Sequence, residues 1–479
     1  MPNLTAPASA CTPPHVAIVG GGVLGSVLAL RLRQYGFTVT LLEAEPALGG
    51  LAAQARIADF AWDRFYHVLL SSDRHTRALI DELGLTGRVR WGTTRTGFFI
   101  DGRLHSLSNA VEFLRFPPLS LLDKLRLGAT IALGSRIRDP RRLEYMLATD
   151  WLRRWSGRRV LERVWSPLLQ SKLGDNDRIA SAAFIWAIIA RMYAARRSGL
   201  KRELFGYLDG GYGPLFDALR ARLVEAGVTF KSSSAVERIV RDGPAARGGF
   251  TLALRDGTTL AADQVVSTLA PALFGRQAPQ LQAAERARLD RVAYQGVLCA
   301  TLLLKRPLSD FYVTNITDRW VPFTGVIEMT ALVDRAAFAG HSLVYLPLYL
   351  AQDDPRWHDS DEAIQTRFLE ALARMYPGFD RADVVDFRIA RARHVLAIST
   401  LGYSTELMPP VATSVPGLFH LTSAQIAYGT LNVNETLGLV ADGLPRLLAL
   451  LEQSLQAAGA AAPARASDRG WLLPDGLSA

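Results

Sequence analysis

The stretch HVAIVGGGVLGSVLALRLRQYGFTVTLLEAE, residues 15–45, constrains the fold more than any other part of the sequence. Its first five residues form an apolar run, which is typical of a short strand buried on both faces. The run ends in a glycine triplet, and Gly20, Gly22 and Gly25 complete the pattern G-x-G-x-x-G. This pattern predicts a tight turn between a strand and a helix, at which a dinucleotide could bind.

The residues after the glycines complete a strand–helix–strand unit. Apolar side chains recur at helical spacing from Val23 to Tyr35, and Gly36 stands where a helix commonly ends. A second apolar run at 37–42 predicts the next strand, which Glu43 closes. An acidic residue about twenty positions beyond the glycines belongs to the dinucleotide-binding fingerprint. We therefore predict a Rossmann-like α/β unit.

Each glycine of this unit has a physical role in holding a dinucleotide. Gly20 permits the tight turn, Gly22 lets the backbone approach a pyrophosphate, and Gly25 lets the helix pack against the strand. Val23 and Leu24 open the helix, whose free amides and partial positive charge attract phosphate groups. All five residues are therefore candidate cofactor contacts.

Glu43 and Ala44 are expected at the adenosine end of the ligand. A carboxylate at the position of Glu43 accepts hydrogen bonds from the ribose hydroxyls. The same negative charge disfavours a 2′-phosphate, so NADP is not the expected ligand.

Length and composition limit the class of protein. A chain of 479 residues suits two domains, and its apolar and charged fractions of 49% and 21% are those of a folded globular protein. Cys11 and Cys299 are its two cysteines, which excludes a disulfide framework and indicates a reducing compartment. No metal site is predicted, because two cysteines and eight scattered histidines show no metal-ligand spacing.

Gly49 and Gly50 form a second glycine pair soon after Glu43. The resulting pattern, E-x-x-x-x-x-G-G, resembles the extension found in the FAD-dependent group that includes amine oxidases, phytoene desaturases and protoporphyrinogen oxidase. In that group the doublet runs beside the pyrophosphate and ribityl chain, where side chains would collide. The resemblance implies that Gly49, Gly50 and Leu51 contact FAD.

Two later segments resemble the same group. Residues 208–240 contain a Gly-Gly turn, a helix, a strand and the segment AVERIV, in which the resemblance places a backbone group of Val236 on the adenine. Residues 257–271 resemble the hairpin and returning strand that bring the chain back beneath the cofactor. Thr268 lies in this segment and is assigned to the cofactor site.

Residues 415–444 resemble the C-terminal flavin segment of the group. The pattern there is a strand, a polar residue on the flavin's phosphate or ribityl chain, a loop, and a helix aimed at the isoalloxazine ring. A helix N-terminus beside that ring would stabilise negative charge on the reduced flavin. Relatives usually have an aspartate after the strand, whereas Thr422 and Ser423 stand here. The residues assigned to the cofactor in this segment are Ser423, Thr430, Leu431 and Asn432.

Together these segments imply FAD as the cofactor. They imply non-covalent binding, because no cysteine lies near the C-terminal flavin segment. The expected fold class is α/β (α+β overall), with a Rossmann-like FAD-binding domain interleaved with a substrate domain of mixed β-sheet and a basic helical lobe. The expected boundaries are 14–100, 205–275 and 412–455 for the FAD-binding domain, 101–204 and 276–411 for the substrate domain with 115–204 as the lobe, and 1–13 and 457–479 for flexible tails.

Candidate active-site residues come from three places. The segment FAWDRFYHVLLSSDR, residues 60–74, passes under the flavin in the resembled group, and it carries Asp63, Tyr66 and His67. The resemblance assigns Asp63 and His67 to the cofactor site. His67 could transfer a proton or donate to the flavin, or it could form a structural pair with Asp63. The aromatic residues expected at the wall of the substrate site are Tyr403 and Tyr428, with core packing as the alternative for both. A side-chain base is not required, because a hydride can pass directly to flavin N5.

Positive charge is concentrated in one region. Residues 115–202 carry nineteen Lys and Arg against seven Asp and Glu. Solvated helix faces would explain this charge, and so would an amphipathic surface that rests on anionic lipid or attracts an acidic substrate. Nucleic acid is not expected as a partner, because no binding motif accompanies the charge.

The same region bears on substrate and location. Protoporphyrinogen-oxidase-like enzymes carry a helical, membrane-touching lobe at this place in the chain, which implies a hydrophobic or amphipathic substrate. Residues 162–213 also resemble a bacterial subfamily of FAD-dependent oxidoreductases. The N-terminus lacks the basic start and apolar core of a signal peptide, so we expect a cytoplasmic protein that could lie peripherally on the inner face of the membrane.

Three functions agree with these patterns. The leading hypothesis is an FAD-dependent oxidoreductase that takes a hydride from a prenyl lipid, a carotenoid-like molecule, a tetrapyrrole or a lipid-linked compound. The second is a flavin-dependent isomerase resembling UDP-galactopyranose mutases, in which Arg191, Arg196 or Arg197 could bind a nucleotide diphosphate. The third is a non-enzymatic prenyl-protein carrier resembling Rab escort proteins, against which the intact FAD elements argue.

Overall fold

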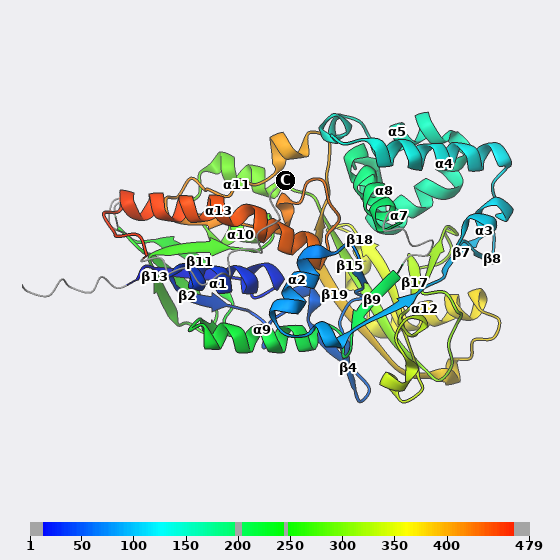
Figure 1. The fold of residues 1–479 in the computed structure, drawn as a ribbon, viewed down its shortest axis with the longest axis horizontal. Helices are drawn as coiled ribbons and strands as arrows, with labels where there is room; N and C mark the ends of the chain where they lie inside the picture. The colour runs from blue at the N-terminus through cyan, green and yellow to red at the C-terminus, as the bar shows by residue number, and fades with distance from the viewer. Residues whose placement is uncertain (1–12, 197–203, 244–247, 464–479) are drawn as a thin grey trace, which may run out of the picture.

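A five-stranded parallel sheet is assembled from strands that lie far apart in the sequence (Figure 1). The structure is a computed structural model that describes residues 13–196, 204–243 and 248–463. Every pair of neighbouring strands in this sheet is parallel, which is typical of a sheet covered on both faces. The strand order is β10 (Thr229–Lys231), β2 (Thr38–Leu42), β1 (His15–Val19), β14 (Gln264–Ser267) and β20 (Leu418–His420).

Alternate residues of β1 face two different layers. Val16 and Ile18 pack with the helices on one face, whereas Ala17 and Val19 pack with a three-stranded antiparallel sheet on the other. The helices are α1 (Val23–Tyr35), α2 (Arg74–Glu82), α9 (Gly213–Glu225) and α13 (Val433–Ala457). The antiparallel strands are β11 (Val236–Arg241), β12 (Phe250–Leu254) and β13 (Thr259–Ala262).

The predicted strand–helix–strand unit is confirmed. Helix α1 spans Val23–Tyr35, and Gly36 ends it with a φ of 112°, in the left-handed region that favours glycine. The first strand covers His15–Val19, and the second begins one residue later than predicted, at Thr38.

A seven-stranded mixed sheet forms the second domain, beside the first (Figure 1). Its order is β19 (Val384–Ala397), β15 (Tyr294–Leu304), β18 (Ser342–Leu350), β17 (Gly325–Glu328), β16 (Val313–Ile316), β7 (Thr96–Ile100) and β8 (Arg103–Ser106). Helix α12 (Asp361–Met375) packs on one face of this sheet, and the hairpin of β3 (Gln54–Ile57) and β4 (Phe60–Asp63) packs on the other.

Two segments belong to a different domain from the one that the expected boundaries gave them. Strand β7 was expected in the first domain, within 14–100, but it pairs in parallel with β16 of the seven-stranded sheet. Helix α11 (Ala283–Asp290) was expected in the second domain, but Leu289 packs in the core beside β14. Strand pairing with a distant segment therefore decides the domain of β7, and apolar packing decides that of α11.

The basic region forms a separate group of helices between β8 and β9 (Leu204–Leu208), as expected (Figure 1). The main helices are α3 (Ala110–Arg115), α4 (Leu121–Arg136), α5 (Ala148–Ser156), α7 (Ser166–Leu173) and α8 (Ala182–Arg196). None of the helices in the described ranges has the length and apolar character needed to cross a bilayer. The predicted tails fall largely outside the described residues, at 1–12 and 464–479.

Candidate functional site

The glycine turn between β1 and α1 forms an open cradle. A Cβ at Gly20 would overlap the Thr268 hydroxyl, and a Cβ at Gly25 would overlap the Gly20 carbonyl oxygen. At Gly22, by contrast, a Cβ would meet no protein atom within 4 Å. Helix α1 starts here without a side-chain cap or an acidic residue in its first turn. Its free amides, beginning with Val23 and Leu24, therefore lie beside a space that suits a phosphate.

The Glu43 carboxylate holds this turn in place. It accepts hydrogen bonds from the Gly21 amide at 2.6 Å and from the Glu45 amide at 2.8 Å. Each carboxylate oxygen keeps a further lone pair, which could accept a ribose hydroxyl. Ala44, between the two glutamates, is exposed. The Ser234 amide donates to the Glu43 carbonyl at 2.8 Å, which brings the segment before Val236 to this end of β2.

The second glycine pair lies against the first. The Gly49 amide donates to the Gly21 carbonyl at 3.0 Å, and a Cβ on Gly50 would lie 3.2 Å from the Gly22 Cα. Gly49 and Gly50 have φ values of 127° and 56°, so both occupy the region that favours glycine. Leu51 follows in a short 3-10 turn and is half-buried. The structure thus brings together the predicted contacts from both glycine segments.

Thr268 and Val236 are already engaged with the protein. The Thr268 hydroxyl donates to the Val19 carbonyl at 2.9 Å, so it ties the residue after β14 to the start of the glycine turn. The Val236 carbonyl accepts a hydrogen bond from the Gln277 side chain at 2.7 Å. The contact of Val236 with an adenine stays a prediction.

Arg191 ties the C-terminal loop to the start of α2. Its guanidinium donates to the Thr430 hydroxyl at 3.1 Å and pairs with Asp73 at 3.3 Å. Asn432 donates to the Thr430 carbonyl at 2.7 Å and caps α13 by accepting from the Glu435 amide at 3.0 Å. Leu431 and Ser423 are half-buried in the same segment. Asp73 was missed by the sequence analysis, because an aspartate ahead of an ordinary helix carries no signal.

Asp63 is buried and His67 is half-buried beside it, and their surroundings favour the neutral form of both side chains. Burial raises the pKa of Asp63 to about 8, although a hydrogen bond from the Tyr212 amide at 2.7 Å opposes this shift. Burial also lowers the pKa of His67 to about 4. The distance from His67 Nδ1 to Asp63 Oδ2 is 3.8 Å, too long for a hydrogen bond. A Cβ on Gly211 would lie 2.6 Å from Asp63 Oδ1, which explains the glycine there.

The tyrosine candidates separate into two places. The Tyr66 hydroxyl shares a hydrogen bond with the Tyr349 hydroxyl at 2.8 Å, and burial holds the pKa of Tyr66 well above its usual value. Tyr403 is 1% exposed and donates to the Ala424 carbonyl at 2.6 Å, so the structure gives it the packing role rather than a place at the wall of a site. Tyr428 donates to Ser404 at 3.1 Å and is half-buried.

Residues 27–430 match the family described as flavin containing amine oxidoreductase. The chain belongs to this family. Proteins of this family bind FAD. The uncapped helix, the open position at Gly22 and the adjoining glycine doublet agree with FAD binding. The residues present therefore fit the cofactor, and the chain is an amine-oxidase-family oxidoreductase.

Individual relatives are distant. A coproporphyrinogen III oxidase from Propionibacterium freudenreichii is 25% identical over 364 residues, which cover 64% of this chain and 66% of that enzyme. The match thus spans just under two thirds of the relative's length.

Solved structures show the same fold at lower identity. A provisionally named protoporphyrinogen oxidase from Exiguobacterium sp. 255-15 has a TM-score of 0.71 at 19% identity, covering 92% of this chain and 99% of that one. A reduced UDP-galactopyranose mutase has a TM-score of 0.69 at 16% identity, covering 93% and 97%. The fold alone therefore does not separate an oxidase from an isomerase.

Proposed function

We propose that this protein holds FAD non-covalently and oxidises a hydrophobic or amphipathic small molecule. When bound, FAD supplies a ring that accepts a hydride at N5. The α1 amides and Gly22 would hold the phosphates, and Glu43 would hold the ribose. Gly49, Gly50 and Leu51 would lie along the chain between phosphate and ring.

Asp63, Tyr66 and His67, together with Tyr349 of the second domain, supply mainly uncharged side chains. At neutral pH His67 is neutral and Asp63 is largely protonated, since burial moves their pKa values to about 4 and about 8. The Tyr66–Tyr349 hydrogen bond fixes two aromatic rings beside this pair. Neutral walls of this kind exclude water and orient an apolar substrate, and no charged base is needed for hydride transfer.

The cysteines support non-covalent binding. Cys299 is fully buried in β15, and burial raises the pKa of its thiol. A protonated, inaccessible thiol is a poor nucleophile. Cys11 lies outside the described residues.

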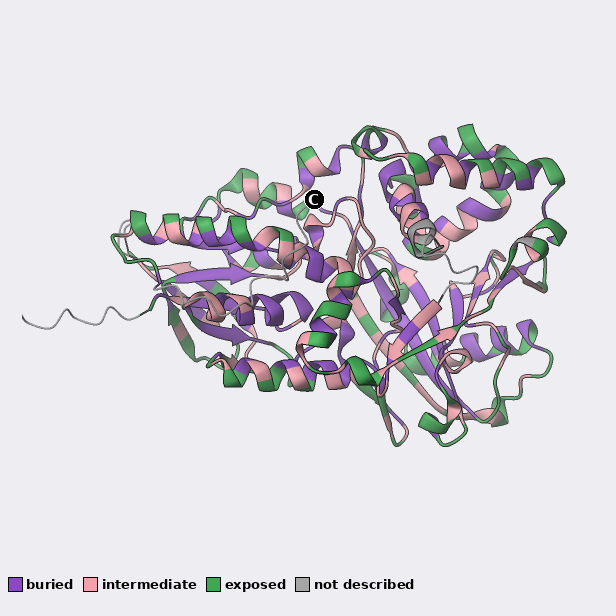
Figure 2. Ribbon diagram, viewed as in Figure 1, coloured by how far each residue is buried: buried purple, intermediate pink, exposed green. Residues whose placement is uncertain are grey.

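One observation carries the choice of an apolar substrate and a membrane-associated site of action. Helices α3 and α4 meet at the outer corner of the helical lobe, where green, exposed segments follow one another (Figure 2). Five large apolar side chains there are between 56 and 72% exposed. They are Val111, Leu114, Leu121, Leu122 and Leu125. Contiguous exposed apolar side chains mark an interaction surface rather than an ordinary solvated helix.

Positive charge surrounds this corner. Arg115 and Arg126 are exposed beside the apolar side chains, and neither forms an ion pair within the described ranges. Apolar side chains flanked by free arginines suit the interface of an anionic bilayer. We therefore propose that the lobe rests on the lipid surface from which the substrate enters.

Arg191 argues against the isomerase alternative. A diphosphate site needs free cations, whereas Arg191 is paired with Asp73. Arg197 lies outside the described residues, as does the side chain of Arg196.

Anaerobic reduction of the flavin tests the proposal. The purified, yellow protein should release its flavin on denaturation, and lipid extracted from its source membranes should bleach the flavin without added reductant. Reoxidation by oxygen or a quinone should then yield a product two hydrogens poorer than the substrate. A flavin that stays with the denatured chain would contradict non-covalent binding. Turnover that needs pre-reduced flavin and yields an isomer would favour the second hypothesis.

A further inference from the structure

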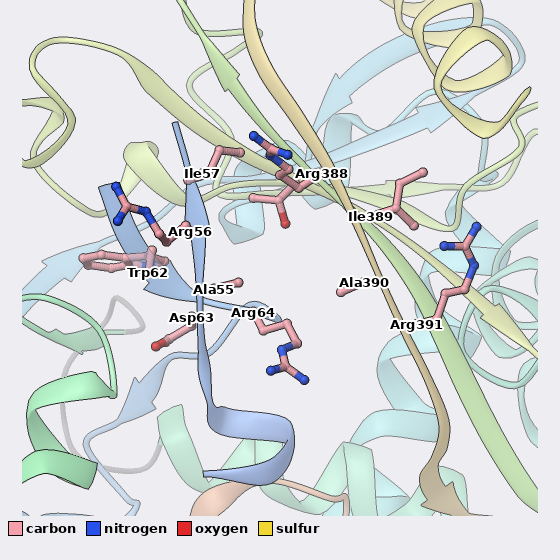
Figure 3. A pocket seen from close by; sticks show the side chains of 11 residues that line it. Ala55, Arg56, Ile57, Trp62, Asp63, Arg64, Arg388, Ile389, Ala390 and Arg391 are labelled. Atoms are coloured by element: carbon pink, nitrogen blue, oxygen red, sulfur yellow. The ribbon is translucent and has the colours of Figure 1, made fainter. Parts of the chain in front are cut away.

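A pocket of about 280 Å³ opens between the β3–β4 hairpin and the edge of the seven-stranded sheet (Figure 3). The hairpin and the turn that follows it supply one wall, and strands β15 and β19 supply the other. The lining includes the apolar residues Ala55, Ile57, Trp62, Ile389 and Ala390, together with Thr301. None of the residues in this pocket belongs to the glycine cradle described above.

The register of β15 and β19 shows which side chains face the hairpin. Arg388 pairs with Thr301 across the two strands, and directly paired residues share a face. Ala390, two positions further along β19, packs in the core that includes the hairpin. Arg391 is turned to the other face, where it pairs with Asp361 at 2.6 Å. Thr301, Arg388 and Ala390 therefore form the sheet side of the pocket.

Arg64 supplies a free positive charge to the hairpin side. Its side chain leaves the end of β4 on the side of the hairpin that faces β19 (Figure 3) and is half-buried. Its backbone amide is fixed by the Ala53 carbonyl at 2.9 Å, but its guanidinium has no hydrogen bond or ion pair within the described ranges. Three other arginines line the pocket. Arg388 already binds Asp386 at 3.0 Å, Arg391 pairs with Asp361, and Arg56 is exposed.

A second unsatisfied polar group belongs to Trp62, another residue that lines the pocket. Trp62 is 4% exposed, and its indole N–H is buried without a hydrogen-bond partner among the described residues. Asp63 lines the same pocket, but its carboxyl should not repel a bound anion. Its carboxyl faces the Tyr212 amide, and burial raises its pKa to about 8, so it is largely uncharged at neutral pH. An unpartnered donor and an unpartnered guanidinium in one partly enclosed space call for an acceptor with negative charge.

We propose that this pocket binds the oxyanion of a small amphipathic molecule, either a carboxylate or a phosphate monoester, with Arg64 as its charged partner. The volume admits a ligand of a few carbons to a single ring, and Ala55, Ile57 and Ala390 contact its apolar part. The site does not depend on the proposed redox function, because none of its residues is assigned to FAD except Asp63.

Calorimetric titration of the full-length, FAD-loaded protein tests this site. The probes are octanoate and phenyl phosphate, their neutral counterparts octanamide and benzyl alcohol, and inorganic phosphate. The anionic probes should bind at least about tenfold more tightly than the neutral ones, as expected for a charge-assisted hydrogen bond. Comparison of octanoate with phenyl phosphate shows which oxyanion the pocket prefers. Inorganic phosphate should bind more weakly than phenyl phosphate, because it lacks an apolar part.

Arg56 provides a matched control. It also borders the pocket, but it is exposed and extends to the side of the hairpin away from β19 (Figure 3), and it too has no ion pair among the described residues. Arg64→Gln should weaken binding of the anions about 10- to 100-fold, whereas Arg56→Gln should change it less than about threefold. Ala390→Leu fills the pocket without removing a charge, so it should also abolish binding of the anions. This variant tests the site if Arg64→Gln does not fold.

Three results would overturn the site. These are equal affinity for octanoate and octanamide, equal effects of Arg64→Gln and Arg56→Gln, or undiminished binding in Ala390→Leu. Flavin content, read from the visible spectrum of each variant, should stay at the wild-type level. A fall in flavin content alone would concern the cofactor site and the proposed function, not this pocket.

Discussion

The Gly49 amide donates a hydrogen bond to the Gly21 carbonyl at 3.0 Å, which joins two glycine segments that are separated in sequence by a helix and a strand. Gly50 lies close enough to Gly22 that a Cβ on Gly50 would be 3.2 Å from the Gly22 Cα. The space beside Gly22 is thus bounded by backbone on both sides. Binding of the cofactor and stability of the fold place different demands on these glycines.

Gly22→Ala and Gly25→Ala should separate those two demands. A Cβ at Gly22 meets no protein atom within 4 Å, and its φ of −68° suits alanine, so the apoprotein should keep its stability. The methyl group would enter the space for the phosphates and weaken FAD binding by about 1–3 kcal/mol. Gly25→Ala should instead destabilise the apoprotein, because its Cβ overlaps the Gly20 carbonyl. Flavin absorbance per chain and urea unfolding of the apoprotein measure the two effects. Equal flavin content in wild type and Gly22→Ala would refute the assignment of the cradle.

Asp63 should make the free energy of unfolding depend on pH. Its folded pKa, about 8, lies above its unfolded value near 4, so its contribution is fully present below about pH 4 and is lost as pH rises through 8. His67, with a folded pKa of about 4 and an unfolded value near 6.5, still titrates at the lower edge of the window from 6.5 to 8, but it is present in both proteins compared below.

Within that window wild type should lose stability relative to Asp63→Asn by about 1.4 kcal/mol per pH unit near pH 6.5, a slope that falls to about half of this value at pH 8. The asparagine variant keeps an oxygen that can accept from the Tyr212 amide, but it has no proton to lose. Urea unfolding of both proteins between pH 6.5 and 8 is the measurement. Parallel pH profiles would show that Asp63 is ionised in the folded protein.

Arg191→Gln should lower both stability and flavin retention. The change leaves Asp73, whose side chain is 7% exposed, without its cation, at a cost of about 1–3 kcal/mol. It also frees Thr430, so the loop before α13 should hold the cofactor less well. Arg31→Gln removes another half-buried pair, with Glu82 at 2.5 Å, and should lower stability alone. If the two variants retain flavin equally, Arg191 has no role in the cofactor site.

The corner of α3 and α4 should bind anionic vesicles. Replacing Leu121 and Leu125 with serine removes two side chains that are 70 and 72% exposed, and it should weaken partition into vesicles about tenfold or more. Val224→Ser is the control, because Val224 is 62% exposed but lies on α9 of the other domain. Co-sedimentation at low salt measures partition. Wild-type protein that stays entirely in the supernatant would remove the lipid surface from the proposal.

Local patterns predicted the local structure well. The bounds of α1 and the left-handed Gly36 follow from apolar spacing and a glycine C-cap, both of which act within a few residues. The glycine cradle was likewise predicted, because Gly20, Gly25, Gly49 and Gly50 are each favoured by backbone geometry or close packing at their own positions, and Gly22 by the space that it leaves open.

Pairings between distant segments were not predictable from such patterns. Nothing near β7 in sequence indicates that it pairs with β16, and nothing near Asp73 indicates Arg191, 118 positions away. Tyr403 shows a second limit. An aromatic residue in an apolar segment suits a pocket wall and a core equally well. The buried hydrogen bond from Tyr403 to the Ala424 carbonyl shows the core role, and the sequence near Tyr403 does not indicate it.

The parallel sheet places β1 between β2 and β14, with β20 beyond β14. A ribosome must therefore synthesise most of this chain before β20 and α13 can join the strands made first. A nascent or prematurely ended polypeptide would have the glycine turn but not the complete cleft. Loading of the flavin should thus wait until β20 and α13 have been made, and the yellow colour would report that these late segments have joined the early ones.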